Sequence, residues 1–171
     1  MPCTQTLSGI AKDCSSNIGG IKNAFIANFD DVTEVSTSSN IISTITMASS
    51  KKFKKYHFRK GTGSVTSTLN VDPTTGVNFV QSDIVLQFSK METTKRVEIA
   101  ALAQAELAII IEDMNGIFWY YGRQEGVSAS AGTGQTGTAR TDGNYYQITL
   151  QDVQESFPLE VDADLIDTIV E

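Results

Sequence analysis

The chain has few of the side chains from which metal centres and catalytic sites are built. It contains one histidine, His57, and two cysteines, Cys3 and Cys14. A zinc site made of Cys and His needs about four such ligands, so the sequence offers too few. The cysteines are interpreted as two free thiols or as one local disulfide. His57 has no serine or aspartate in a recognisable triad context. The sequence therefore predicts no metal, no cofactor and no enzymatic activity.

Long apolar segments are also missing. No apolar run approaches the roughly 18 residues that a membrane span requires, and residues 1–8 lack the basic and apolar regions of a secretory signal. Three prolines, 40% hydrophobic residues and 19% charged residues are the composition of an ordinary globular protein. We expect one domain over residues 1–171, made in a cytoplasm and without a membrane partner. A domain of this size removes roughly 70% of its unfolded surface from water.

Basic residues are the minority among the charges. Thirteen Lys and Arg stand against twenty Asp and Glu, which gives a net charge of −7. This balance disfavours a protein whose task is to grip nucleic-acid phosphates. It suits a surface that repels a polyanion and lets it slide past.

Nearly half of these basic residues nevertheless lie within ten positions, interleaved with aromatic side chains. They form the basic cluster: Lys51, Lys52, Lys54, Lys55, Arg59 and Lys60. Three interpretations are open. The lysines can protect an edge strand against mispairing, or form a patch that receives the acidic C-terminal residues of a neighbouring copy. They can also hold a phosphate backbone while the aromatic rings stack on bases.

What the sequence has in abundance is β-strand patterning. Period-two alternation and short β-branched or aromatic runs predict strands at residues 21–28, 41–47, 52–59, 64–71, 77–89, 107–113, 117–122 and 145–151. Residues 30–39 are expected to form a polar connection. Residues 92–106 are rich in Ala, Leu, Glu and Gln and predict an amphipathic helix. The order indicates a mainly β fold, an antiparallel β-sandwich or barrel with one flanking α-helix.

Two segments are expected to lack regular structure. Residues 1–20 are small and polar and predict an arm or loop, and residues 123–138 predict a flexible Gly/Ser loop. Within that loop Gly132, Gly134 and Gly137 match the letters of a dinucleotide fingerprint. The strand, helix and acidic residue that this fingerprint needs around it are missing. Mobile loops are common at contact surfaces, so these glycines are predicted subunit contacts.

An aromatic run and an acidic segment supply further predicted contacts. The run at residues 118–121 should present rings on both faces of its strand, and an uncovered face would be a protein contact through Trp119 and Tyr121. Residues 159–171 hold five acidic and no basic residues, with enough apolar side chains to dock as a strand or short helix. Asp162 and Asp164 lack the other ligands of a calcium loop. They are predicted subunit contacts, as are four members of the basic cluster: Lys52, Lys54, Lys55 and Arg59.

Four short motifs occur in a recognisable order. They are Gly-Gly-Ile-Lys-Asn-Ala-Phe-Ile-Ala-Asn at 19–28, Glu-Asp-Met-Asn-Gly at 112–116, Gly-Thr-Ala-Arg-Thr-Asp-Gly-Asn-Tyr-Tyr-Gln-Ile-Thr-Leu at 137–150, and Ser-Phe-Pro at 156–158. With strands and one central helix between them, they resemble the tail tube proteins of tailed bacteriophages, and those of Bacteroidetes phages in particular. The resemblance spans roughly residues 19–158.

The resemblance implies a β-sandwich or barrel with a flanking helix, and six copies in a ring. Rings would stack into a tube in the virion tail, beside other virion proteins, and DNA would pass through the lumen without specific binding. It also implies an acidic lumen, no catalytic residues and synthesis in the cytoplasm of a host bacterium. The basic cluster departs from this pattern, because in the lumen it would hold DNA. We therefore expect it to face outward or to contact another subunit.

Other functions stay open beside this one. A neck or tail-completion ring and a capsid decoration protein have the same style of sequence. Exposed strand edges and complementary charged segments also favour head-to-tail contacts that close into rings or continue as filaments, independently of the resemblance. The competing class is a monomeric β-sandwich or barrel that binds a small ligand or a carbohydrate. A stable monomer of 18.5 kDa in sedimentation would favour that class.

Overall fold

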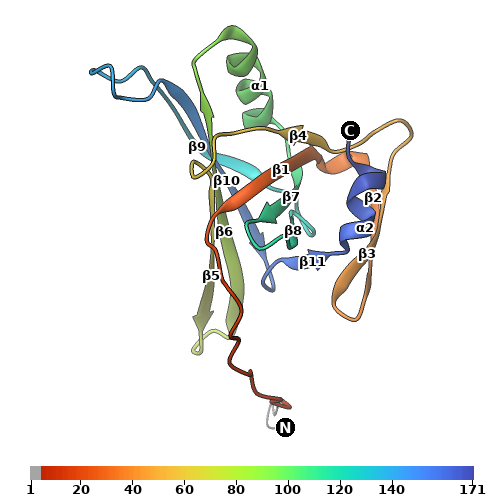
Figure 1. Cartoon of the computed structure of the whole chain (residues 1–171). Helices are drawn as coiled ribbons and strands as arrows, with labels where there is room; N and C mark the ends of the chain where they lie inside the picture. The colour runs from red at the N-terminus through yellow and green to blue at the C-terminus, as the bar shows by residue number, and fades with distance from the viewer. Residues whose placement is uncertain (1–4) are drawn as a thin grey trace.

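The computed structural model describes residues 5–171 and shows a mainly β protein with two sheets (Figure 1). The large sheet holds β1 (Ile21–Asn28), β2 (Val32–Ser38), β3 (Ile41–Met47), β4 (Lys54–Tyr56), β7 (Leu107–Asp113), β8 (Phe118–Tyr121) and β11 (Leu159–Val161). The small sheet holds β5 (Ser64–Asp72), β6 (Val77–Ser89), β9 (Ser128–Gln135) and β10 (Tyr145–Gln154). Two helices, α1 (Thr93–Gln104) and α2 (Ala163–Ile169), and a 3-10 turn, η1 (Phe29–Asp31), complete the described residues.

The strand orders are β2-β3-β11-β8-β7-β1-β4 in the large sheet and β5-β6-β10-β9 in the small sheet. All neighbours are antiparallel except β11, which runs parallel to β3. The predicted sandwich with a flanking helix is confirmed, and α1 lies within the predicted residues 92–106. The acidic residues 159–171 dock as predicted, and they form both a strand and a short helix. Neither helix of the described residues is long and apolar enough to cross a membrane.

β7 explains how the core is divided. Its residues 107–112 are all buried, without the alternation of a strand that has one wet face. Ile109 and Ile111 belong to the cluster between the two sheets, whereas Ala108 and Ile110 belong to a second cluster on the other face of the large sheet, which α2 joins through Ile166. A strand that is covered on both faces reads as a continuous apolar run. The large sheet is therefore the central layer of the molecule.

Two predicted connections are strands instead. Residues 30–39 were expected to be a polar connection, and they contain β2, which pairs with β3. Val32 and Val35 pack against the second core cluster, whereas the polar side chains of Thr33, Glu34, Thr37 and Ser38 are exposed. Such half-exposed positions accept Thr and Ser readily in a strand, so polarity alone was a poor guide.

The flexible loop predicted at residues 123–138 is also wrong, because it contains β9, which pairs with β10. A Cβ at Gly134 would lie 2.9 Å from the ring of Tyr146, so the glycine is where an aromatic side chain covers the strand. The connection after β9 is ordered by Asp142, whose Oδ2 accepts hydrogen bonds from the peptide N–H groups of Thr138 and Ala139, both at 2.8 Å. These bonds, that of Ala139 first, hold the pKa of Asp142 below its usual value.

The strand predicted at residues 52–59 is confirmed only over β4. Phe53 is fully buried, and its N–H donates to the carbonyl oxygen of Ile169 at 2.9 Å. Since that donor is used by α2, it cannot extend the ladder between β4 and β1. β4 is the last strand at its edge of the large sheet.

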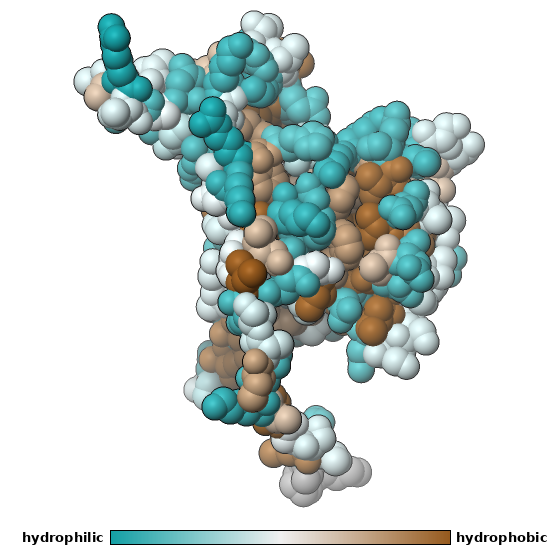
Figure 2. Space-filling view, viewed as in Figure 1, coloured by the Kyte–Doolittle hydropathy of each residue, from teal (hydrophilic) through white to brown (hydrophobic). Residues whose placement is uncertain are grey.

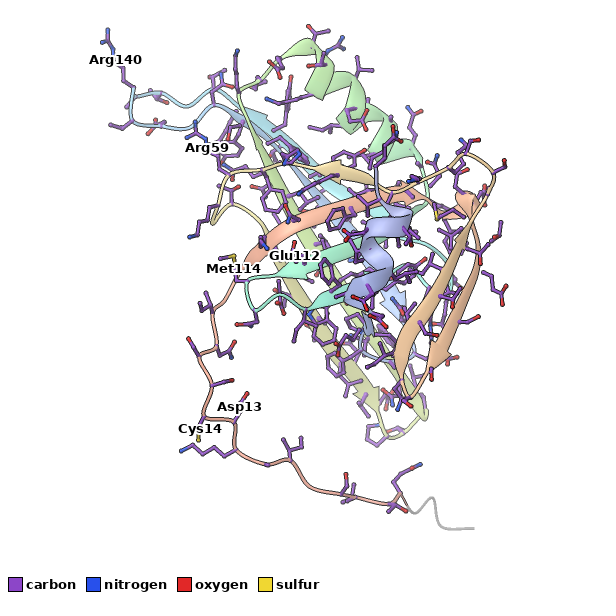
Figure 3. All side chains as sticks on the ribbon, turned by 45° about the vertical axis from the view of Figure 1, so that its right-hand side comes forward. Asp13, Cys14, Arg59, Glu112, Met114 and Arg140 are labelled. Carbon is purple, nitrogen blue, oxygen red and sulfur yellow. The ribbon has the colours of Figure 1, made fainter. Side chains whose placement is uncertain are left out.

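The expected arm is present over residues 5–20, which have no helix or strand and are exposed throughout. The N–H of Ile18 donates to Oδ1 of Asn115 at 3.0 Å, which ties the base of the arm to the turn between β7 and β8. Figure 3 shows the rest of the arm leading away from both sheets, with Cys14 exposed on it. The other cysteine, Cys3, lies outside the described residues, so the structure does not test the predicted disulfide alternative.

Candidate functional site

The outer face of the small sheet consists mostly of polar side chains, as a solvent-facing surface does, but the charged side chains on it are all acidic. The buried residues of β6 and β10, such as Ile84 and Leu150, point to the core, so the residues between them point outward. We call these outward residues the polar face: Ser64, Thr66, Thr68, Asn70, Asp72, Val77, Phe79, Gln81, Asp83, Val85, Gln87, Ser89, Ser128, Ala131, Thr133, Gln135, Tyr145, Gln147, Thr149, Gln151 and Val153. No Lys or Arg lies on this face in the part of the chain that the structure describes.

A carboxylate at the centre of the polar face is held by glutamine side chains. Nε2 of Gln151, directly across from Asp83, donates to Oδ1 of Asp83 at 3.0 Å. Nε2 of Gln81 lies 3.5 Å from its other oxygen, Oδ2. With Asp72 at one end of the sheet, Asp83 makes the polar face weakly acidic. Neutral Gln, Thr and Ser side chains make up most of the remainder.

The small sheet also ends in two strands that each have one free edge. Among residues 5–171, β5 pairs only with β6, and β9 pairs only with β10. Every second peptide group along such an edge points away from the sheet and has no partner in the ladder. A second copy could therefore continue the sheet on either side.

The basic cluster lies on and beside β4, at an edge of the large sheet, and all six of its side chains are exposed. This position fits the interpretation of an edge strand protected by lysines. Nζ of Lys54 pairs with the carboxylate of Glu171, and Nζ of Lys51 lies 3.6 Å from Oδ1 of Asp31. Lys54 thereby lowers the pKa of Glu171. Within one chain the cluster thus pairs with a single acidic residue of the C-terminal segment, Glu171. One of the interpretations had paired it with the acidic C-terminal residues of a neighbouring copy.

Basic side chains are concentrated in one part of the molecule. Besides the six of the basic cluster, Lys90, Lys95 and Arg96 lie on or next to α1, and Arg140 lies on the connection between β9 and β10 (Figure 3). Lys51, Lys52 and Lys54 share a groove with residues of α1, so the cluster borders that helix. Figure 2 shows hydrophilic side chains gathered over β4 and α1. By contrast, residues 61–89, which include β5 and β6, contain no Lys or Arg.

The aromatic strand β8 is covered by the protein itself on both faces. Tyr121 is 4% exposed and packs with Trp119 against the cluster between the sheets, while Phe118 and Tyr120 pack against the second cluster. Nε1 of Trp119 donates to Oδ2 of Asp113 at 3.1 Å. Burial raises the pKa of Tyr120 and Tyr121. Neither ring predicted as a contact forms an exposed aromatic patch.

The other predicted contacts are exposed. Gly132 and Gly134 lie on the edge strand β9, and Gly137 lies just after it. Asp162 caps α2, where its Oδ1 accepts a hydrogen bond from the N–H of Asp164 at 3.1 Å. The structure therefore brings the predicted contacts together in two places, the free edge of β9 and the region around β4 and α2, and it does not join them into one site.

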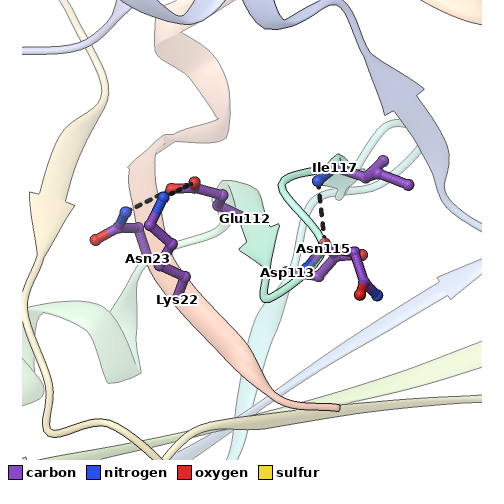
Figure 4. Close-up of polar contacts among 6 residues, drawn as sticks. All are labelled: Lys22, Asn23, Glu112, Asp113, Asn115 and Ile117. Carbon is purple, nitrogen blue, oxygen red and sulfur yellow. Dashed lines mark hydrogen bonds and ion pairs between the residues drawn. The ribbon is translucent and has the colours of Figure 1, made fainter. Parts of the chain in front are cut away.

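The adjacent carboxylates at 112–113 lie at the end of β7, where such side chains can hold the following turn. Asp113 has that role, since its Oδ1 accepts from the N–H of Asn115 at 2.8 Å and from that of Ile117 at 3.0 Å (Figure 4). Glu112 differs, because it is buried and lies 2.6 Å from Nζ of Lys22. The alternation along β1 covers too few residues to predict that Lys22 lies beside Glu112.

A second buried carboxylate, Asp152, was missed. It follows Ile148 and Leu150 on the core face of β10, is 1% exposed, and its Oδ1 has no hydrogen-bond partner among the described residues. Its other oxygen accepts from Nε2 of Gln154. Desolvation raises the pKa of Asp152, against the opposing effect of that bond. The period-two pattern of β10 would have revealed this position.

The described residues contain no group of three or more His, Cys, Asp or Glu side chains placed to hold a metal ion. Comparison with protein-family models, with curated proteins and with solved structures finds no match.

Proposed function

We propose that this chain is a virion structural protein whose copies assemble into rings, and that the rings stack into a phage tail tube for DNA passage. The chain carries out no reaction under this proposal and holds no cofactor. The observation that supports it best is the polar face of the small sheet, which has no cation in the described residues and lies between two free strand edges.

The chemistry of the polar face suits a surface past which DNA moves. DNA phosphates are held by Lys and Arg, and each such contact makes binding tighter. A lumen lined by Gln, Thr and Ser with Asp83 offers hydrogen-bonding groups that water also satisfies, and a carboxylate that repels phosphate. DNA would therefore meet no strong binding point along the wall.

The free edges explain how such a face could close into a ring. If the edge of β5 in one copy pairs with the edge of β9 in the next, the small sheets form one continuous wall. A contact between two different surfaces of this kind repeats around an axis and closes when the rotation fits. The same pairing removes both edges from solvent, which is how barrels avoid aggregation.

Stacking of rings is supported by the difference between the two ends of the small sheet. Around the turn from β5 to β6 the chain exposes the apolar side chains Leu69, Val71 and Val77, together with Asp72. The other end of the sheet leads into α1 and the basic residues around it. A head-to-tail contact would bring unlike charges together and bury the exposed apolar side chains.

Electron microscopy of the purified full chain tests the proposal. We expect rings or tubes, whereas a monomer of 18.5 kDa at every concentration would contradict it and favour a ligand-binding module.

A charge placed on the polar face tests its role in the lumen. We expect the double variant Thr149→Lys, Gln151→Lys to form tubes that retain DNA protected from nuclease, because the lysines would bind phosphate inside the lumen. The matched control Thr37→Lys, Ser38→Lys places the same charges on exposed positions of β2, in the large sheet. If the control protects as much DNA as the first variant, the polar face does not line the lumen.

A further inference from the structure

The large sheet is completed by the last strand of the chain. β11 lies between β3 and β8, with Val161 opposite Ile42 on one side and opposite Phe118 on the other. In the described residues β2 pairs only with β3, so the hairpin of β2 and β3 joins the rest of the sheet through β11. We call residues 159–171 the docking segment, and we call the place that they occupy between β3 and β8 the slot.

The slot holds the docking segment through apolar side chains. Val161 is 1% exposed, Ile166 6% and Ile169 5%, and all three pack with Ile42 and Phe53 in the second core cluster. A patch of this kind would be exposed to water if the docking segment left it. It would need a new occupant of the same shape.

Backbone hydrogen bonds fix the register of the docking segment at both ends. The N–H of Asp162 donates to the carbonyl oxygen of Ile42 at 3.0 Å. At the other end the N–H of Phe53 donates to Ile169, and that of Glu171 donates back to Phe53 at 3.0 Å. The slot therefore recognises an extended start, one short helix and an extended end.

Charge adds to this recognition. The docking segment carries five acidic residues and no basic one. Its end lies beside the basic cluster, where Glu171 pairs with Lys54. The slot therefore holds an amphipathic peptide whose last residue is acidic.

The link to the docking segment is short and weakly held. Residues 155–158 connect β10 of the small sheet to β11 of the large sheet, and Phe157 is 52% exposed. Within the link, the hydrogen bonds are from the N–H of Glu155 to Gln124 and from Oγ of Ser156 to the next carbonyl. A short link of this kind favours exchange, because the segment can pack in the same way on another copy once the link extends.

We propose that the slot between β3 and β8 also takes the docking segment of a second copy, so that neighbouring subunits exchange residues 159–171 on assembly. The proposal deepens the assembly described above and rests on two copies meeting. Exchange would make each subunit's large sheet depend on its neighbour. The apolar packing and the backbone hydrogen bonds of the docking segment would be the same in the exchanged arrangement, now between two copies.

Two single-cysteine chains test the exchange. Lys54→Cys and Glu171→Cys are made separately in a Cys3→Ser, Cys14→Ser background, mixed before assembly, and treated with a short bismaleimide. Neither chain has a second thiol with which to link internally, and each variant assembled alone measures linking between like positions of two copies. A linked dimer that forms only in the mixture therefore reports Glu171→Cys of one copy beside Lys54→Cys of another. The chain that carries both replacements is the control for reactivity. Its two cysteines link within one copy when the docking segment occupies the slot of its own chain.

The outcomes separate the exchange from the ring. We expect linked dimers in the assembled fraction of the mixture. Rings without linked dimers, while the double-cysteine control links internally, would overturn the exchange and leave the ring. Linked dimers without rings would support the exchange and contradict the ring, and an unlinked monomer in all fractions would overturn both.

Discussion

Replacing Asp152 by asparagine should stabilise the protein at neutral pH. Asp152 is buried between the sheets, and its Oδ1 has no partner in the described residues, whereas Nε2 of Gln154 donates to the other oxygen. An unsatisfied buried polar group costs about 1–3 kcal/mol, and a charged one costs more than a neutral one. Asparagine keeps the shape and one acceptor for Gln154, and it removes the charge. We expect a gain of roughly 1–2 kcal/mol in the free energy of unfolding.

The gain should depend on pH in a defined direction. Desolvation raises the pKa of Asp152 above its usual value. The folded state therefore favours the protonated acid, and the contribution of this group is fully present below the unfolded pKa. It is lost as pH rises through the folded pKa. The asparagine variant has no such titration, so its advantage should be small near pH 4 and larger at pH 7.

Urea unfolding at the two pH values measures the effect. Trp119, the only tryptophan, is partly buried and donates to Asp113, so its fluorescence reports unfolding. A gain of 1–2 kcal/mol would also raise the melting temperature by about 2–8 °C for a domain of this size.

A matched control is Asp83→Asn, which makes the same change on the outer face of the same sheet. Asp83 accepts from Gln151, so losing its charge should leave stability unchanged or slightly lower. The reasoning is refuted if Asp152→Asn is less stable than the natural chain at pH 7, or if the difference between them is the same at pH 4.

Two further predictions concern a tight turn and the basic cluster. Gly122→Ala should cost roughly 3 kcal/mol, because its φ is +83° and an added Cβ would lie 2.6 Å from the backbone oxygen of Leu107. Gly116→Ala, at a φ of +84° with open space around it, should cost only about 1 kcal/mol in thermal unfolding. Equal losses would show that the close approach to Leu107 does not matter. Reversing charge at Lys52, Lys54 and Lys55 should weaken assembly in a salt-dependent way and change monomer stability by less than about 1 kcal/mol, since all three side chains are exposed. Sedimentation at low and high salt checks this, and unchanged assembly would leave only the edge-strand role.

The sequence was informative where local pattern and fold agree. Residues 79–89 alternate between partly exposed and buried positions, and β6 was predicted with its observed bounds. β9 was missed because Gly, Ser and Ala carry little strand propensity, and its pairing is set by β10 and by the ring of Tyr146. The position of β11 could not be read, because its parallel partner β3 is far away in the chain.

The candidate site shows the same limit. The lysines of the basic cluster indicated an edge strand, and β4 is one. No pattern indicated that Lys54 meets Glu171 of its own chain, because that pairing depends on how α2 docks on Phe53. Once Ile84, Leu86 and Phe88 are known to face the core, the residues that alternate with them on β6 can be predicted to belong to the polar face. The two free edges of its sheet could not have been predicted in this way, because they depend on the strand order.

The most direct test is an electron cryomicroscopy map of the assembled protein at a resolution that resolves the strands. We expect Asp83 and Gln151 to point into a central lumen, with β5 of each copy beside β9 of the next. A map with the basic cluster in the lumen, or with the small sheets facing outward, would contradict it.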